Sequence, residues 1–360
     1  MHQHVESQKK TRESLLAHLL SYPKSEITDI FKFIFQSAFG CEHLVSAEEK
    51  AIAYITHEYT EMTVESPITV DPLDGDYSRV HLSCLSRGLT PETLGKLFCR
   101  SAKAEENGNV ALQEKIKAAT NLIAEGMLPF SADDFRNALD QWNAAGCPPV
   151  HHSEAFRQAY HPAYRVIAND YVEFLPLFEE LDRRLKNGNI VLAIEGGSAS
   201  GKTTLANLLS GIYDATVFHM DDFFLRPEQR TPERFAEAGG NVDRERFLSE
   251  VLLPLHEGKN VLYRPFNCTT QTIESAEKIS PKQLTIIEGA YSMHPELSSF
   301  YDLTVFLDIS PEYQRERILM RNSPQFAERF FNKWIPLEEI YQEKMHVKER
   351  CDLSFSICKK

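Results

Sequence analysis

The 360-residue sequence lacks long apolar runs. Its apolar segments, such as Ile190–Ile194, are the size of a β-strand, whereas a helix that crosses a bilayer needs roughly 20 consecutive apolar residues. The N-terminal residues also lack the apolar core of a signal peptide. These absences predict a soluble, cytoplasmic protein without a membrane partner.

Positive charge is also scarce. The chain has 39 Lys and Arg against 52 Asp and Glu, which gives a formal net charge of -13. Because a protein that binds along a nucleic-acid strand needs a basic surface, this composition predicts no nucleic-acid partner. A local basic pocket for a single nucleotide stays compatible with an acidic chain.

Metal and disulfide patterns are missing as well. The seven cysteines are an odd number and include no C-x-x-C pair, so reduced thiols in a cytosolic protein are the simplest interpretation. The histidines near Cys41–His43, at His81 and at His151–His152 lack the spacing of zinc ligands. We therefore expect no structural metal.

The first part of the chain, to about Tyr164, carries mostly helical signals. Helix boundaries are indicated by a capping box at Ser46 and Glu49, an N-cap with proline at Thr90-Pro91, and a start at Ser131 that Gly146 ends. Residues 64–91 are rich in turn residues, and residues 146–165 form a connector without a clear period. We predict a mainly α-helical domain over residues 1–165.

The pattern changes after Asn187-Gly188. Short apolar or β-branched runs now alternate with helical segments; the runs are Ile190–Ile194, Ala215–His219, Leu284–Ile287, Leu303–Leu307 and Leu353–Ile357. Such alternation predicts an α/β fold with a doubly wound parallel sheet, covered by helices on both faces. We assign this second domain to residues 166–360, after a helix over Val166–Lys186.

A glycine-rich phosphate-binding motif follows the first of these strands. Gly196–Thr203 satisfies G-x-x-x-x-G-K-[ST], which places a P-loop NTPase fold in this domain. Backbone N–H groups of such a loop surround phosphates, while Lys202 supplies a positive charge and Thr203 a hydroxyl for Mg²⁺. The residues predicted to bind ATP are Gly196, Gly197, Ser198, Ala199, Ser200, Gly201, Lys202, Thr203 and Thr204.

Two carboxylates follow neighbouring predicted strands. Asp221 lies two residues after the run Ala215–His219, so it is expected near the γ-phosphate, where a general base meets an acceptor hydroxyl. The alternative is that Asp221 and Asp222 cap a helix or lie on a solvated turn. Glu288 ends the next strand and is predicted to hold Mg²⁺ through water; the alternative is a carboxylate satisfied by backbone N–H groups.

These motifs together resemble a known family. The stretch Glu195–Thr204, the H-M-D-D-F-F run at His219–Phe224 and Ile287-Glu288-Gly289 are similar to the uridine kinase group, which includes nicotinamide riboside kinases and, more distantly, pantothenate kinases. The resemblance covers about the second half of the chain. It implies that Asp221 acts on the hydroxyl of the substrate.

The resemblance also implies a lid and an acceptor wall. Kinases of this group close a helical lid whose arginines stabilise the transferring phosphate, and here Ser310-Pro311 starts a helix with Arg315, Arg317 and Arg321, followed by Arg329. Arg317 and Arg321 are four residues apart and share a helix face, so we assign both to the catalytic set. Val261–Phe266 resembles the substrate segment, which makes Tyr263 and Phe266 candidate acceptor contacts.

Two functions remain open at this point. The first is an ATP- and Mg²⁺-dependent kinase that phosphorylates a hydroxyl of a small nucleoside- or vitamin-like acceptor. The second is a nucleotide-dependent regulatory or assembly protein that uses the kinase-like domain as a switch. The role of the helical part is equally open: it could shape the acceptor site, form a homo-oligomer or carry an unrelated function.

Overall fold

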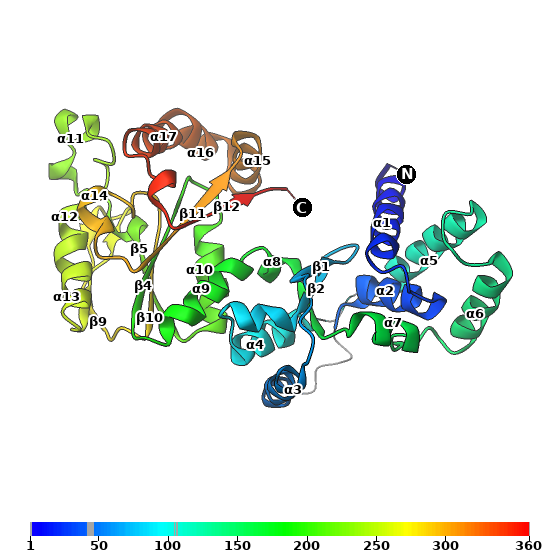
Figure 1. The fold of residues 1–360 in the computed structure, drawn as a ribbon. Coiled ribbons are helices and arrows are strands. Elements are labelled where there is room, and N and C mark those ends of the chain that lie inside the picture. Colours follow the sequence, from blue (N-terminus) through cyan, green and yellow to red (C-terminus); the bar gives the residue numbers. More distant parts are fainter. Residues whose placement is uncertain (1, 42–46, 104, 106, 360) are drawn as a thin grey trace. The chain divides into compact units, whose positions relative to one another are not determined.

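The computed structural model describes residues 2–41, 47–103, 105 and 107–359. The chain forms two compact units, Met1–Arg183 and Arg184–Lys360 (Figure 1). The predicted boundary after residue 165 differs from this division. Residues 164–168 form a strand that pairs within the first unit, and the helix after it also belongs largely to that unit.

The N-terminal unit is mainly helical, as the sequence predicted. Its helices are α1 (His2–Ser21), α2 (Ile27–Phe39), α3 (Glu48–Glu61), α4 (Pro91–Ser101), α5 (Gly108–Ala124), α6 (Ala132–Ala144), α7 (Glu154–Tyr160), α8 (Asn169–Val172) and α9 (Leu175–Leu185). The Thr90 hydroxyl accepts a hydrogen bond from Thr93 N, and Ser131 caps α6 in the same way. The predicted cap at Ser46 lies outside the described residues.

A small antiparallel sheet also belongs to this unit. Its strands are β1 (Val70–Pro72), β2 (Tyr77–His81) and β3 (Tyr164–Ala168), in the order β1-β2-β3. The sequence predicted only turns over residues 64–91 and a helix from Val166. The strand β2 was not predicted, because its polar and apolar residues do not alternate as in a half-buried strand. It is buried along its whole length although it contains Arg79 and His81.

The C-terminal unit contains a five-stranded sheet in the order β12-β11-β4-β10-β5, and every pairing in it is parallel. The strands are β4 (Ile190–Gly196), β5 (Ala215–His219), β10 (Leu284–Glu288), β11 (Leu303–Ile309) and β12 (Leu353–Ile357). All five lie where the sequence predicted a strand. Two short two-stranded ribbons accompany them, formed by β6 (Val261–Tyr263) with β9 (Glu277–Ile279) and by β7 (Phe266–Asn267) with β8 (Thr272–Ile273).

Helices connect these strands and cover the sheet. They are α10 (Lys202–Ile212), α11 (Pro232–Ala236), α12 (Arg244–Phe247), α13 (Leu253–His256), α14 (Pro295–Ser298), α15 (Pro311–Arg321), α16 (Pro324–Arg329) and α17 (Ile335–Lys344). The helix α10 packs against β4, β5 and β10. Phe247 and Tyr341 belong to a buried cluster with Ala193 and Ile287 of the sheet, whose neighbours Leu192 and Ile286 are also buried. Since successive strand residues point to opposite faces, both faces are covered, which confirms the predicted doubly wound α/β fold.

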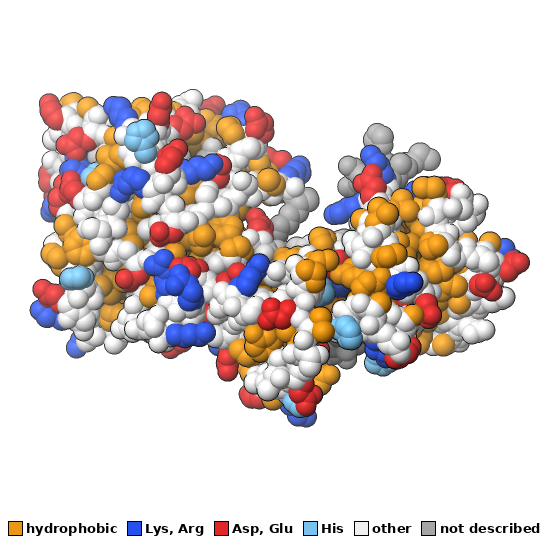
Figure 2. All heavy atoms as spheres, viewed as in Figure 1, with side chains coloured by type: hydrophobic (Ala, Val, Ile, Leu, Met, Phe, Trp, Pro, Cys, Tyr) orange, Lys and Arg blue, Asp and Glu red, His pale blue; other side chains and the backbone are white. Residues whose placement is uncertain are grey.

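Charged side chains of both signs are interspersed over the face drawn in Figure 2. Within the described residues, no helix is both long enough and apolar enough to span a membrane.

Candidate active site

The P-loop connects the central strand β4 to helix α10. Gly201 is the N-cap residue of α10, with a φ of 105°. At the start of the loop Gly196 has a φ of 150°, and a Cβ there would lie 2.6 Å from the carbonyl oxygen of Leu307. Only glycine fits such a position, because a side chain would meet both a strained backbone and a neighbouring strand. Because Gly201 is the N-cap of α10, the loop lies at the N-terminal end of this helix, where the helix dipole favours an anion.

Lys202 lies inside this loop. Its Nζ donates to the carbonyl oxygens of Gly196 and Gly197, each at 2.9 Å. These contacts fold the Lys202 side chain back over the loop. Its charge also acts on the neighbouring carboxyls, since it lowers the pKa of Glu288 and opposes the rise in the pKa of Asp221.

A group of oxygen and nitrogen atoms lies beside the first turn of α10. The Thr203 hydroxyl donates to Glu288 Oε1 at 3.0 Å, and His219 Nδ1 lies 2.6 Å from the same oxygen. Glu288 and His219 are opposite each other in the β10–β5 pairing, which brings both to the carboxyl edge of the sheet. Burial alone would raise the pKa of Glu288, but the hydrogen bond and charge of His219, with Lys202, hold it below its usual value.

His219 is a site residue that the sequence interpretation passed over. Its hydrogen bond to Glu288 raises the pKa of the imidazole above the ordinary value. The signal was available, because His219 is the last residue of a predicted strand and parallel strands end at the same edge. In the described part of the chain no group of three His, Cys, Asp or Glu side chains has the arrangement of a metal cage.

Asp221 follows β5 in a short 3₁₀ turn, Met220–Phe223. The residue is exposed to solvent, yet protein atoms packed around its carboxyl disfavour the charged form and raise its pKa. The negative charges of Glu288 and Asp222 raise this pKa further. No described residue donates a hydrogen bond to the Asp221 carboxylate, so its oxygens are available to a bound molecule.

Asp222 is used within the protein. Its carboxylate accepts a hydrogen bond from the Tyr263 hydroxyl, which also accepts from His219 N at 3.3 Å. The Tyr263 ring is buried against Phe218, at 5.1 Å between centroids. These contacts fit a positioning role for Tyr263, with its hydroxyl turned to the Asp221–Asp222 turn rather than left free for an acceptor.

The other candidate acceptor residue, Phe266, begins β7 and is 4% exposed. The Arg230 guanidinium lies 5.8 Å from the centre of its ring. Arg230 donates to the carbonyl oxygen of Leu225 at 2.8 Å. This aromatic ring and cation therefore lie near the turn that carries Asp221, since Leu225 follows the end of that turn by two residues and β7 contacts the turn.

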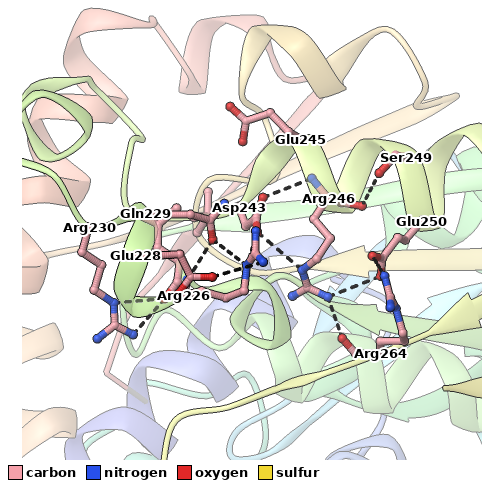
Figure 3. A network of polar contacts seen from close by, with 12 residues as sticks. Arg226, Glu228, Gln229, Arg230, Asp243, Glu245, Arg246, Ser249, Glu250 and Arg264 are labelled. Atoms are coloured by element: carbon pink, nitrogen blue, oxygen red, sulfur yellow. Dashed lines mark hydrogen bonds and ion pairs between the residues drawn. The ribbon is translucent and has the colours of Figure 1, made fainter. Parts of the chain in front are cut away.

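Arg246 connects the turn after β5 to the segment between Tyr263 and Phe266. Figure 3 shows its contact with Arg264. Arg246 is 8% exposed, and it donates to the carbonyl oxygens of Asp222 at 3.0 Å and Arg264 at 2.6 Å. Its guanidinium also lies 4.0 Å from the ring centre of Phe223. Nothing in the local sequence indicated this role, because the two partners are 24 and 18 residues away.

Asp243, from the segment Asn241-Val242-Asp243, caps helix α12. Its Oδ1 accepts from Arg246 N at 3.2 Å, and its Oδ2 lies 3.9 Å from Arg226 Nε. Because the carboxylate is 2% exposed and its charge is balanced by two arginines, it stabilises the network of Figure 3.

The two arginines predicted for the lid lie in different surroundings. Arg317 is beside the P-loop: a Cβ on Gly201 would be 3.5 Å from its Nη1. Arg321 is exposed, and its guanidinium lies 6.0 Å from the ring centre of Phe330. The structure therefore brings Arg317 to the P-loop and leaves the exposed Arg321 beside the ring of Phe330.

Two residues from distant helices contact the loop at Ser198. Gln314 of α15 donates to the Ser198 carbonyl oxygen at 2.8 Å. Glu338 of α17 accepts from Ser198 N at 2.7 Å and from the Ser198 hydroxyl at 2.6 Å. Burial raises the pKa of Glu338, although Lys202 and Ser198 oppose this. Gln314 precedes Arg317 by one helical turn, which is the signal that could have identified it.

Glu195 lies directly before the loop and is completely buried. One of its carboxylate oxygens accepts from Gly196 N at 2.8 Å; the other accepts from Met293 N and from the Tyr341 hydroxyl, each at 3.0 Å. Burial raises its pKa to about 7 against the opposing effect of these donors. Glu195 thus anchors the base of the P-loop within the core.

A P-loop after the central strand of a parallel sheet, with carboxylates at the ends of the neighbouring strands, defines a P-loop nucleotide-binding domain. Residues 191–326 match the family model "Phosphoribulokinase / Uridine kinase family". This match confirms the resemblance seen in the sequence and confines it to the C-terminal unit.

Individual proteins match over about a third to a half of this chain. The bifunctional alpha-galactosidase/sucrose kinase AgaSK of Mediterraneibacter gnavus is 31% identical over 215 residues, which cover 52% of this chain and 22% of that protein. A phosphoribulokinase of Synechocystis sp. is 25% identical over 131 residues, or 34% and 39% of the two chains. The solved structure of a possible uridine kinase from Bacillus stearothermophilus is 26% identical, with a TM-score of 0.38, and covers 50% of this chain and 99% of that one. The chain thus spans well under half the length of these two curated relatives.

Proposed function

We propose that this protein is an ATP-dependent small-molecule kinase that phosphorylates a hydroxyl of a nucleoside- or vitamin-like acceptor. The single observation that carries the proposal is the position of Asp221. Its carboxylate has a raised pKa and no hydrogen-bond donor among the described residues, and it shares the electrostatic environment of the P-loop lysine. A nucleotide switch needs no such group, whereas a phosphotransferase needs one to orient or deprotonate the acceptor.

In this proposal each residue has a defined role. Asp221 accepts the proton of the acceptor hydroxyl. The oxygen of that hydroxyl forms a bond to the γ-phosphorus of ATP, and the bond from this phosphorus to the leaving ADP oxygen breaks. Lys202 and Arg317 stabilise the negative charge on the transferring group. Arg321, which we also placed in the catalytic set, would need the lid to move before it could take part.

The residues around the loop fit a magnesium ion and the phosphates of ATP. Thr203 and Glu288 offer only oxygen atoms, which is the ligand type that Mg²⁺ prefers, and their number leaves room for water and phosphate. A bound Mg²⁺ would neutralise phosphate charge. The remaining phosphate contacts would come from the backbone N–H groups of residues 196–204, as in other loops of this sequence pattern.

The acceptor class is inferred from the aromatic surroundings of the site. Phe266 is 4% exposed and has the Arg230 guanidinium near its ring, so it would support a wall on which Arg230 meets a ring-bearing acceptor. The names of the relatives point in several directions, to sucrose, to ribulose phosphate and to uridine. Sugars and nucleosides therefore both belong in the test.

The decisive experiment is an acceptor screen with the full chain. Nucleosides, vitamins and sugars are first ranked by thermal shift with a non-hydrolysable ATP analogue and Mg²⁺, because a ligand that binds only the native state raises its stability by mass action. Hits are then tested for ADP release and for the phosphorylated product by mass spectrometry. We expect turnover with one ring-bearing acceptor.

The matched control is Lys202→Met, which should abolish turnover and so exclude a contaminating kinase. Turnover that persists in Lys202→Met would contradict the assignment. Tight ATP-analogue binding without turnover of any acceptor would favour the nucleotide-dependent switch instead.

A further inference from the structure

The N-terminal unit contains a cavity of about 300 Å³ that no part of the kinase proposal uses. Its lining comes from α1, the segment after α3, the sheet β1-β2-β3 and the end of α7. Its size lies at the lower end of the range for small-molecule sites. Polar groups on one wall and aromatic rings on another give it a defined chemistry.

The first polar group is Arg79, in the middle of the central strand β2. The side chain is 1% exposed. Its Nε donates to Gln36 at 2.9 Å, and its Nη1 donates to Asp71 at 3.3 Å. Arg79 is among the residues that line the cavity, and its buried Nη2 has no hydrogen-bond partner among the described residues. The bonds to Gln36 and Asp71 use two of the five N–H donors of the guanidinium, so three remain without a hydrogen-bond partner among the described residues, which is costly in a buried place unless a ligand or water accepts them.

The second polar group is His81, two residues further along the same strand and therefore on the same face. It is 5% exposed, and neither ring nitrogen has a partner within the described part of the chain. Burial lowers the pKa of His81 to about 4, so the imidazole is neutral near pH 7. It therefore offers one N–H donor and one acceptor nitrogen to the cavity.

Another part of the lining is aromatic. The rings of Tyr22 and Phe156 lie 5.2 Å apart, and Tyr160 meets both of them edge to face at 5.0 and 4.8 Å. All three residues line the cavity. They provide a rigid apolar surface for the body of a ligand.

The sign of the ligand's charge follows from the neighbouring groups. The carboxylate of Asp71 is already balanced by Arg79. Glu65 lines the cavity as well, so its lining carries two carboxylates and one guanidinium. The preference for an anion therefore rests on the guanidinium itself, because hydrogen bonds from a guanidinium to an oxyanion are charge-assisted and stronger than those to a neutral oxygen.

We propose that this cavity is a second small-molecule site, for a ligand that carries an oxyanion on a flat organic body. The oxyanion is a carboxylate or a phosphate monoester. Its oxygens accept hydrogen bonds from Arg79 Nη2 and His81, while the body packs against Tyr22 and Tyr160. This site shares no residue with the P-loop.

The test is calorimetric titration of the full chain with phenyl phosphate, benzoate and benzyl alcohol. Saturating non-hydrolysable ATP analogue and Mg²⁺ are present throughout, so that the P-loop cannot take up the probes. We expect at least one of the two anions to bind at least tenfold more tightly than the neutral alcohol. The stronger of the two identifies the oxyanion as carboxylate or phosphate.

Variants locate the binding. His81→Phe keeps a ring of similar size but removes both nitrogen atoms, and it should weaken the preferred anion at least tenfold. If that variant does not fold, Tyr160→Ala, at a half-buried wall position, should weaken the same anion instead. His57→Gln, an exposed histidine on α3, is the matched control and should change nothing. Equal binding of anions and alcohol, no binding of any probe, or unchanged affinity in a folded cavity variant would overturn the proposal.

Discussion

Replacement of Asp221 by asparagine tests the proposed chemistry most directly. The side chain is exposed and accepts no hydrogen bond from a described residue, so the substitution should change stability by no more than about 0.5 kcal/mol. A general base contributes about 10²- to 10⁴-fold to a rate. We therefore expect kcat to fall by about 10²-fold or more, which corresponds to about 2.7 kcal/mol of transition-state stabilisation.

The affinity for ATP should behave differently. Asp221 lies in the field of Glu288 and Asp222, and all three negative charges oppose an incoming triphosphate. Removal of one of them should leave the ATP dissociation constant unchanged or lower it slightly. The expected signature is a large loss in kcat without loss of ATP binding, measured by steady-state kinetics and by calorimetry with a non-hydrolysable analogue.

The pH profile gives a second readout. A general base works only when it is deprotonated. We therefore expect kcat/KM to fall as the pH falls through the pKa of Asp221, which is raised above the usual 3.8. The residual activity of Asp221→Asn should lack this limb. Asp214→Asn, at a carboxylate 81% exposed, is the control and should match the wild type. A kcat of Asp221→Asn within threefold of the wild type would refute the assignment.

Three further predictions concern the loop and the lid. Gly196→Ala should abolish binding of the ATP analogue in calorimetry, whereas Gly188→Ala, with a φ of 147° but open space around it, should bind normally. Arg317→Gln should lower kcat by about 10²-fold, and Arg321→Gln by less than tenfold; equal effects would contradict the different surroundings of the two guanidinium groups. The pKa of Glu195 is about 7 in the folded state, against 4.5 for an unperturbed glutamate in the unfolded chain. The free energy of unfolding should therefore fall by about 3 kcal/mol as the pH rises from 4.5 to 7. Glu195→Gln should flatten that profile in urea unfolding at pH 5 and pH 8.

The strands of the large sheet could be predicted because each is a short apolar run bounded by polar or turn residues. The run Ala215–His219 was predicted to the residue. The strand β2 could not be predicted in the same way, because Arg79 and His81 occupy buried positions that a binary pattern assigns to apolar residues. Their burial depends on partners such as Gln36, which lies 43 residues away along the chain.

The candidate site likewise contains residues that could be predicted from the sequence and residues that could not. The P-loop and the residues at the ends of β5 and β10 follow from motif and topology, because parallel strands deliver their last residues to one edge. Tyr263 illustrates the limit of a local pattern. The sequence placed it near the acceptor, whereas its hydroxyl is bonded to Asp222, a contact that depends on the packing of a separate ribbon.

The residues that fix the conformation of the P-loop could not be predicted from the local sequence. Gln314 and Glu338 bind Ser198 across 116 and 140 residues. Glu195 is adjacent to the loop, but two of its hydrogen-bond donors, Met293 and Tyr341, come from distant segments. The backbone amides of the loop are therefore oriented by three elements, β4, α15 and α17, and two of these follow the loop by more than a hundred residues. It follows that a chain ending before α17 would keep the whole motif and still lose the carboxylate that orients Ser198, so the sequence motif alone does not build the phosphate-binding loop.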